Sequence, residues 1–266
     1  MNITIPYDEF RIWKQLIAPQ LTGLNEAAEE IIEYALTEIL NNAQDHSGGN
    51  KVTVSVSQDQ DDVKVTIGDD GIGIFRHIMD HLHLDQALDA AIELIKGKFT
   101  TQPECHSGEG LFFTSLAVDQ LTICANSYCL ELASSQATFK DVEEILGTKV
   151  TVHLRKTLNR SLEAIFNAYC HVGKDQIPVF DRTVFRLQLA QSEGRLISRS
   201  QAKRVMNGME RFATVEVDFT GVDNIGQGFA DEMFRVWPSF HNQTVIKPTY
   251  ASDKVKKLIS RVTHRL

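Results

Sequence analysis

The sequence predicts an α/β protein built from two units, of which the first is the larger. Residues 25–46 carry apolar side chains at helical spacing, which predicts one long helix with a single buried face. Residues 52–67 alternate apolar and polar side chains on both sides of a polar turn, which predicts a β-hairpin. Strand and helix patterns restart after Gly173, so we expect domains at 1–172 and 173–266.

The shorter elements follow in sequence order. In the first unit we expect helices at 85–96, 111–118 and 159–170, and strands near 120–125, 128–133 and 148–154. In the second unit we expect helices at 198–212, 226–236 and 252–264, and strand patterns within 177–190, 213–219 and 243–247. Residues 7–21 carry large apolar side chains that either cover the first sheet or exchange across a homodimer.

The composition is that of a globular protein. Of the 266 residues, 42% are hydrophobic, enough to bury a core. The net charge of −8 disfavours nucleic acid and anionic membranes as partners. There is no apolar run of ~18 residues and no signal-peptide core, so we expect a cytoplasmic protein. The four cysteines match no C-x-x-C pattern, and we expect all of them to be reduced thiols.

The first candidate motif lies within the long helix. Glu38 and Asn42 are four residues apart and therefore share one helix face. A carboxamide oxygen can ligate Mg²⁺, and a carboxylate can deprotonate a nucleophile. The alternative interpretation is an ordinary exposed helix face.

Two glycine-rich motifs follow. The segment 69–74, DDGIGI, comes directly after a strand, where glycines let the backbone approach a flat ligand and a carboxylate can accept from its amine. An ordinary Asp-Gly turn is the alternative. Gly108 and Gly110 open a helix, where backbone N–H groups can face phosphates. The sequence contains no G-x-x-x-x-G-K-[ST] phosphate loop.

Taken in this order, the motifs resemble those of the superfamily of gyrase, heat-shock-90, histidine-kinase and mismatch-repair ATPases. Its E-x-x-x-N-A, D-x-G-x-G, G-x-G-L and Gly-Thr motifs are matched by Glu38, Asn42 and Ala43, by Asp69, Gly71 and Gly73, by Gly108, Gly110 and Leu111, and by Gly147 and Thr148. The resemblance, strongest to stand-alone and anti-sigma-factor members, implies a Bergerat ATP-binding fold. That fold is an α/β sandwich with helices over one face of a mixed sheet.

The resemblance also implies roles for these residues. Asn42 would ligate Mg²⁺, the metal of the site, and Asp69, helped by Thr148, would accept from the adenine amine of ATP. Glu38 would be the catalytic general base for attack on the γ-phosphate. Glycine backbone would shape the adenine pocket and cradle the phosphates, at Gly71, Gly73, Gly108, Gly110 and Leu111.

A mobile lid over 97–110 is implied as well. In it, Lys98 can reach a phosphate as a point charge, with a solvated lysine as the alternative. His106 is a further candidate for nucleotide binding. Three histidines within 77–83 are compatible with a metal site, but no acidic or cysteine pattern completes a tetrahedral ligand set.

The second unit has a resemblance of its own. VEVDFTGVDNIGQGFADEMF, at 215–234, resembles the strand–turn–helix of STAS-like domains, whose phosphorylated serine lies near the turn. Here the turn Ile225–Gly228 contains no serine or threonine. We therefore expect a regulatory or docking domain, for a protein partner or a dimer mate, rather than a self-phosphorylated one.

Three functions are open at this point. The first is an enzyme, a Mg²⁺-dependent ATPase or protein serine/threonine kinase of bacterial signalling. The second is a non-catalytic, nucleotide-gated switch or scaffold that binds a partner through the STAS-like domain. The third, a chaperone or DNA-repair clamp, is disfavoured because the segment after residue 159 does not resemble a long transducer domain.

Overall fold

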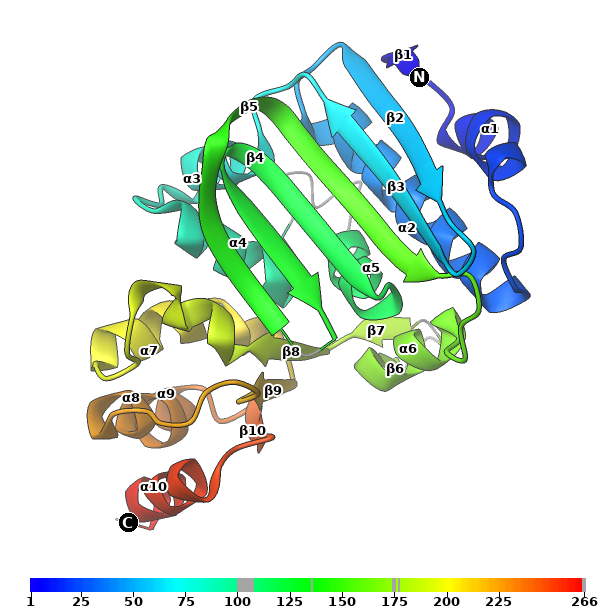
Figure 1. Ribbon diagram of the computed structural model, residues 1–266. Coiled ribbons are helices and arrows are strands. Elements are labelled where there is room, and N and C mark those ends of the chain that lie inside the picture. Colours follow the sequence, from blue (N-terminus) through cyan, green and yellow to red (C-terminus); the bar gives the residue numbers. More distant parts are fainter. Residues whose placement is uncertain (100–107, 135, 174–175, 177, 265–266) are drawn as a thin grey trace. The chain divides into compact units, whose positions relative to one another are not determined.

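The computed structural model describes residues 1–99, 108–134, 136–173, 176 and 178–264 (Figure 1). The chain divides into two compact units, one of residues 1–134 and 139–166, the other of residues 135–138 and 167–266. Each unit combines helices with a sheet, which confirms the predicted α/β class.

The first unit is built on a five-stranded sheet in the order β1-β2-β3-β5-β4. The pairs β1–β2, β2–β3 and β3–β5 are antiparallel, and Val54 lies opposite Ile67 in the predicted hairpin. β5 starts earlier than predicted, because the exposed charged residues of its first half obscure the alternation. The strands are β1 Asn2–Thr4, β2 Lys51–Gln58, β3 Asp62–Asp69, β4 Gln120–Ala133 and β5 Gln136–Arg155.

Helices cover one face of this sheet, as the resemblance implied (Figure 1). The largest is the predicted one, α2 (Glu26–His46), which starts at Asn25 because the Asn25 side chain accepts a hydrogen bond from the Ala28 amide at 3.0 Å. Its apolar residues are buried, among them Ile31, Leu36 and Ile39. The other helices of this unit are α1 Glu9–Ile12, α3 Ile74–Leu82, α4 Ala87–Lys96 and α5 Gly110–Ala117, and α6 Leu162–Tyr169 begins in this unit and ends in the second.

Two segments complete this unit. In the N-terminal segment, Ile12, Trp13 and Ile17 are buried, and α1 with the following π-helix Trp13–Ile17 packs against α2.

The helix α3 was not predicted from the sequence, although Phe75 and Ile78 are buried at helical spacing. Within the part of the chain that the structure describes, no helix is long and apolar enough to cross a membrane.

The second unit contains a three-stranded parallel sheet in the order β10-β9-β8, as expected of an α/β unit. Its strands are β8 Arg182–Arg186, β9 Thr214–Asp218 and β10 Val245–Thr249, and a separate pair is formed by β6 Cys170–Val172 and β7 Pro178–Phe180. Its helices are the 3₁₀ helix Leu187–Glu193, α7 Arg199–Met206, α8 Gln227–Asp231, the π-helix Glu232–Val236, α9 Trp237–Phe240 and α10 Asp253–Thr263.

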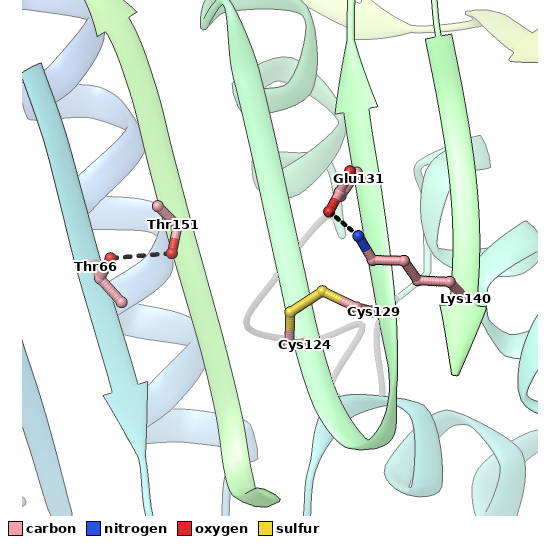
Figure 2. Close-up of a disulfide and its surroundings, with 6 residues drawn as sticks. All are labelled: Thr66, Cys124, Cys129, Glu131, Lys140 and Thr151. Carbon is pink, nitrogen blue, oxygen red and sulfur yellow. Dashed lines mark hydrogen bonds and ion pairs between the residues drawn. A yellow bond between two sulfur atoms is a disulfide. The ribbon is translucent and has the colours of Figure 1, made fainter. Parts of the chain in front are cut away.

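The cysteines correct one expectation. Cys124 and Cys129 form a disulfide across the two arms of β4, whereas we expected reduced thiols (Figure 2). Their spacing matches no local pattern, and only the reversal of the chain within β4 places them face to face. Cys170 is not part of a disulfide, and Cys105 lies outside the described residues.

Candidate functional site

The first unit contains a cavity of about 270 Å³, close to the lower end of the usual range for small-molecule sites. Three segments far apart in sequence meet there: one face of α2, the end of β3 with the start of α3, and the start of α5. Of the residues singled out from the sequence, the cavity is lined by Glu38, Asn42, Asp69, Gly73, Gly108, Gly110, Leu111 and Thr148.

One face of α2 forms the first wall. Glu38, Asn42 and His46 lie at intervals of four residues and all line the cavity, while the opposite face is buried in the core. All three side chains are half-buried. The packing of α2 therefore holds a carboxylate, a carboxamide and an imidazole on one rigid surface.

Asp69, the last residue of β3, organises the second wall. Its Oδ1 accepts hydrogen bonds from the Gly71 amide at 2.9 Å and from the Thr148 amide at 3.1 Å. Burial raises the pKa of Asp69 above its usual value, the two backbone hydrogen bonds oppose that rise, and the neighbouring Asp70 adds to it. The carboxylate thus joins the loop after β3 to β5, at a cost in desolvation.

Thr148 and the two glycines differ in their relation to the cavity. Thr148 is buried, and its Oγ1 accepts from the Ile74 amide at 2.9 Å, which places the start of α3 beside β5. Gly73 lines the cavity directly. Gly71 does not line it, and contributes the amide that Asp69 binds.

The start of α5 forms the third wall. The N-cap residue Glu109 makes no side-chain hydrogen bond to cap the helix, so the first backbone N–H groups are not capped in that way. A Cβ atom on Gly110 would lie 1.9 Å from Oε2 of Glu38. Only glycine lets the Glu38 carboxylate come this close to the start of α5.

Two histidines that were not predicted to belong to the site also form part of it. His46 and His77 both line the cavity, with ring centroids 6.3 Å apart. Burial lowers the pKa of His77, and His81 lowers it further, which favours the neutral imidazole. The spacing of four residues after Asn42 was the available signal for His46. His77 had no such signal, because it belongs to the helix that was not predicted.

The two remaining candidates are placed differently. The cavity is lined by Phe99 and not by its neighbour Lys98. His106 and most of the expected lid over 97–110 lie outside the described residues.

Comparison with known families agrees with this geometry. Residues 27–158 match the model described as histidine kinase-, DNA gyrase B- and HSP90-like ATPase, and residues 201–256 match a STAS-like domain of unknown function. The first match contains all three walls of the cavity. A search of the curated proteins found no significant match. A domain of the ATPase family implies that the chain binds ATP.

Replacing Gly110 by alanine tests its close contact with Glu38. We expect Gly110→Ala to lower the free energy of unfolding by about 1–3 kcal/mol, because the new methyl group overlaps the carboxylate. In a Glu38→Ala background that penalty should disappear, since the overlapping atoms are gone. Urea unfolding of the four proteins measures the coupling. Equal penalties in both backgrounds would show that the two residues do not touch.

The raised pKa of Asp69 predicts how stability changes with pH. Above its pKa in the folded protein the buried carboxylate is charged and destabilises the fold, and this effect fades as pH falls through that pKa. Asp69→Asn keeps an oxygen acceptor without charge, so it should be at least as stable as the wild type at pH 7. Its advantage should shrink towards pH 4. Urea unfolding at several pH values checks this, and an advantage that grows on acidification would contradict it.

Proposed function

We propose that this chain, which contains a histidine kinase-, DNA gyrase B- and HSP90-like ATPase domain at residues 27–158, is a Mg²⁺-dependent ATPase or protein serine/threonine kinase of bacterial signalling. The observation that carries the proposal is the convergence of three separate motifs on one cavity. We propose domains at 1–172 and 173–266, a cytoplasmic location, and regulation through the second domain.

Asp69 and Thr148 would hold the adenine end of ATP. Both line the cavity, and Oδ1 of Asp69 is already tied to two backbone amides. A carboxylate fixed in this way is a rigid acceptor for the exocyclic amine of adenine. The desolvation that raises its pKa also strengthens a hydrogen bond made there, because water competes less.

The start of α5 would hold the phosphates. Gly108, Gly110 and Leu111 line the cavity where the positive end of the helix dipole and the first N–H groups lie. Lys98 remains a proposed phosphate contact, and His106 remains a proposed nucleotide-binding residue.

The oxygen atoms on α2 fit Mg²⁺. Asn42, Asn41 and Glu38 line the cavity together and supply carboxamide and carboxylate oxygens, the donor type that this hard ion prefers. Asn42 would be its protein ligand. The ion, when bound, would offset negative charge on the phosphates.

Glu38 would act as the general base. Its carboxylate lies against Gly110 at the proposed phosphate end, where it can accept a proton from the attacking water or from a protein hydroxyl. His46 and His77 are further groups on the cavity wall, and neutral His77 would add a hydrogen-bonding group without charge.

The second domain favours docking over phosphorylation. At the turn Ile225–Gly228, which has no hydroxyl group, the Gly226 amide donates to Leu196 O at 2.7 Å, and a Cβ on Gly226 would lie 2.6 Å from the Ile197 Cα. The turn is thus packed directly on neighbouring backbone. A protein partner or a second copy of the chain would bind this domain. In the alternative function, a non-catalytic switch, ATP binding alone would control that partner.

Titration of ATP with Mg²⁺ tests binding. We expect wild-type protein to bind ATP, and Asp69→Asn to lose about tenfold to a hundredfold in affinity, because the new amide donor faces the adenine amine donor. Asp61→Asn, an exposed change on the same strand–turn unit, is the control. Folded wild-type protein that binds no ATP would rule out the proposed site.

Glu38→Ala separates the enzyme from the switch. If Glu38 is the general base, the variant should lose about 10²–10⁴-fold in ATP turnover or phosphotransfer while its ATP affinity stays close to that of the wild type. Glu30→Ala, on an exposed part of the same helix, should leave the rate unchanged. Wild-type turnover that survives in Glu38→Ala would remove the catalytic role, and absence of turnover in the wild type would favour the switch.

A further inference from the structure

The turn within β4 contacts the loop that forms one wall of the nucleotide cavity. Asn126, in this turn, donates a hydrogen bond from Nδ2 to Ile72 O at 3.0 Å and accepts one at Oδ1 from the Arg76 amide at 3.3 Å. The Asn126 backbone has φ 55°, a left-handed conformation that asparagine and glycine tolerate best. A single side chain therefore holds the backbone on both sides of Gly73.

These bonds replace a helix cap that α3 lacks. The N-cap residue of α3 is Gly73, which has no side chain to satisfy the first helical amides. The Ile74 amide is satisfied by Thr148, and the Arg76 amide by Asn126, both from distant parts of the sequence. Since Gly73 and Ile74 line the cavity, the position of Asn126 helps to set the position of that wall.

The fit between Asn126 and Gly73 is close. A Cβ atom on Gly73 would lie 2.6 Å from both Nδ2 and Oδ1 of Asn126. The carboxamide thus lies flat against the Gly73 backbone. Because Asn126 and Gly73 are in close contact, a movement of the β4 turn must either displace the Ile72–Arg76 backbone or break the two hydrogen bonds of Asn126.

The disulfide closes the same turn. Cys124 and Cys129 flank Asn126 on the two arms of β4, and their bond joins the arms next to the turn (Figure 2). Cys129 is only 3% exposed, whereas Cys124 is half-buried and is the more exposed residue of the pair. Disulfides in reducing compartments are usually transient and redox-sensing.

A second contact would keep the arm in place without the disulfide. Tyr128 stacks on Phe139 of β5 at 5.4 Å and meets Phe75 of α3 edge-on at 6.4 Å. Opening the disulfide should therefore loosen the turn without unfolding the sheet.

We propose that Asn126 is a positioning residue of the nucleotide site, and that the Cys124–Cys129 disulfide acts through it as a thiol-redox switch of ATP affinity. The proposal rests on the proposed ATP site. In the closed state the turn is held and Asn126 supports the Ile72–Arg76 backbone. In the open state this support weakens, and ATP binds less tightly.

The switch operates by thiol–disulfide exchange with a dithiol reductant. A thiolate of the dithiol attacks Sγ of Cys124, the Cys124–Cys129 bond breaks, and Cys129 leaves as a thiolate that takes up a proton. The second thiolate of the dithiol then displaces Cys124, which is protonated in turn. The dithiol becomes a cyclic disulfide, and the protein gains two electrons and two protons.

The test compares oxidised and dithiothreitol-reduced protein by calorimetric titration with Mg²⁺ and ATP. All proteins carry Cys105→Ser and Cys170→Ser, so that only the disulfide pair responds. We expect reduction to raise the Kd for ATP about tenfold, which corresponds to a loss of about 1.4 kcal/mol of binding free energy. The double variant Cys124→Ser/Cys129→Ser should bind as the reduced protein does, whether or not reductant is present.

Three variants show whether the effect runs through Asn126. Asn126→Gly keeps the left-handed turn but lacks the carboxamide, so it should bind weakly and no longer respond to reduction. Asn126→Asp keeps the acceptor for the Arg76 amide and should recover part of the affinity. Thr151→Val is the matched control, since it removes the 2.9 Å hydrogen bond to Thr66 in the same sheet (Figure 2) and should respond to reduction like the wild type.

Hydrogen exchange gives a readout that does not require ATP. Reduction should speed exchange at the Arg76 amide, which Asn126 holds, more than at the Ile74 amide, which Thr148 holds. If ATP binds equally well to oxidised and reduced protein, the redox switch is overturned. If no ATP binds but Arg76 exchange still responds, the proposed function fails and the redox-dependent support stands. If no ATP binds and exchange at the Arg76 amide does not change on reduction, both the proposed function and the redox switch are wrong.

Discussion

The carboxylate of Asp69 is the constraint on which the rest of the site depends. Its Oδ1 accepts a hydrogen bond from one amide in the loop after β3 and from one amide in β5, so a single atom joins the end of β3, that loop and β5. Burial makes the charge unfavourable, which is why its pKa is raised. A group that is costly to bury and is nevertheless tied to the backbone is typical of a site kept for binding rather than for stability.

The long helix α2 serves packing and chemistry at the same time. Its buried face places Ile31, Leu36 and Ile39 in the core, and its other face presents Glu38, Asn42 and His46 to the cavity. Because the helix is fixed by its core residues, the backbone positions from which these polar side chains extend are fixed as well. The glycine at position 110 then lets α5 approach Glu38, so the proposed catalytic carboxylate and the proposed phosphate end belong to one rigid arrangement.

The second unit has a different organisation, with parallel strands and polar contacts that stiffen its helices. Asp231 is buried and accepts hydrogen bonds from Arg199 at 2.7 Å and from Arg235 at 2.6 Å, which lowers its pKa. The bond from Arg199 ties α7 to α8, the helix that follows the STAS-like turn, whereas Arg235 lies four residues after Asp231 on the same helical run. A stiff domain without a hydroxyl at that turn suits a role in docking.

The sequence by itself determined the local features: α2 and its cap, the β2–β3 hairpin, and the motifs at Glu38, Asp69 and Gly108. These depend on helical or strand periodicity and on glycines at fixed spacing, which neighbouring residues reveal. Only the tertiary structure decided the rest. α3 has no cap of its own and depends on Thr148 and Asn126, His77 reaches the cavity because α3 forms, and Cys124 meets Cys129 because β4 turns back on itself. Each of these depends on residues that are distant in sequence or brought together by a chain reversal, which periodicity and spacing cannot encode.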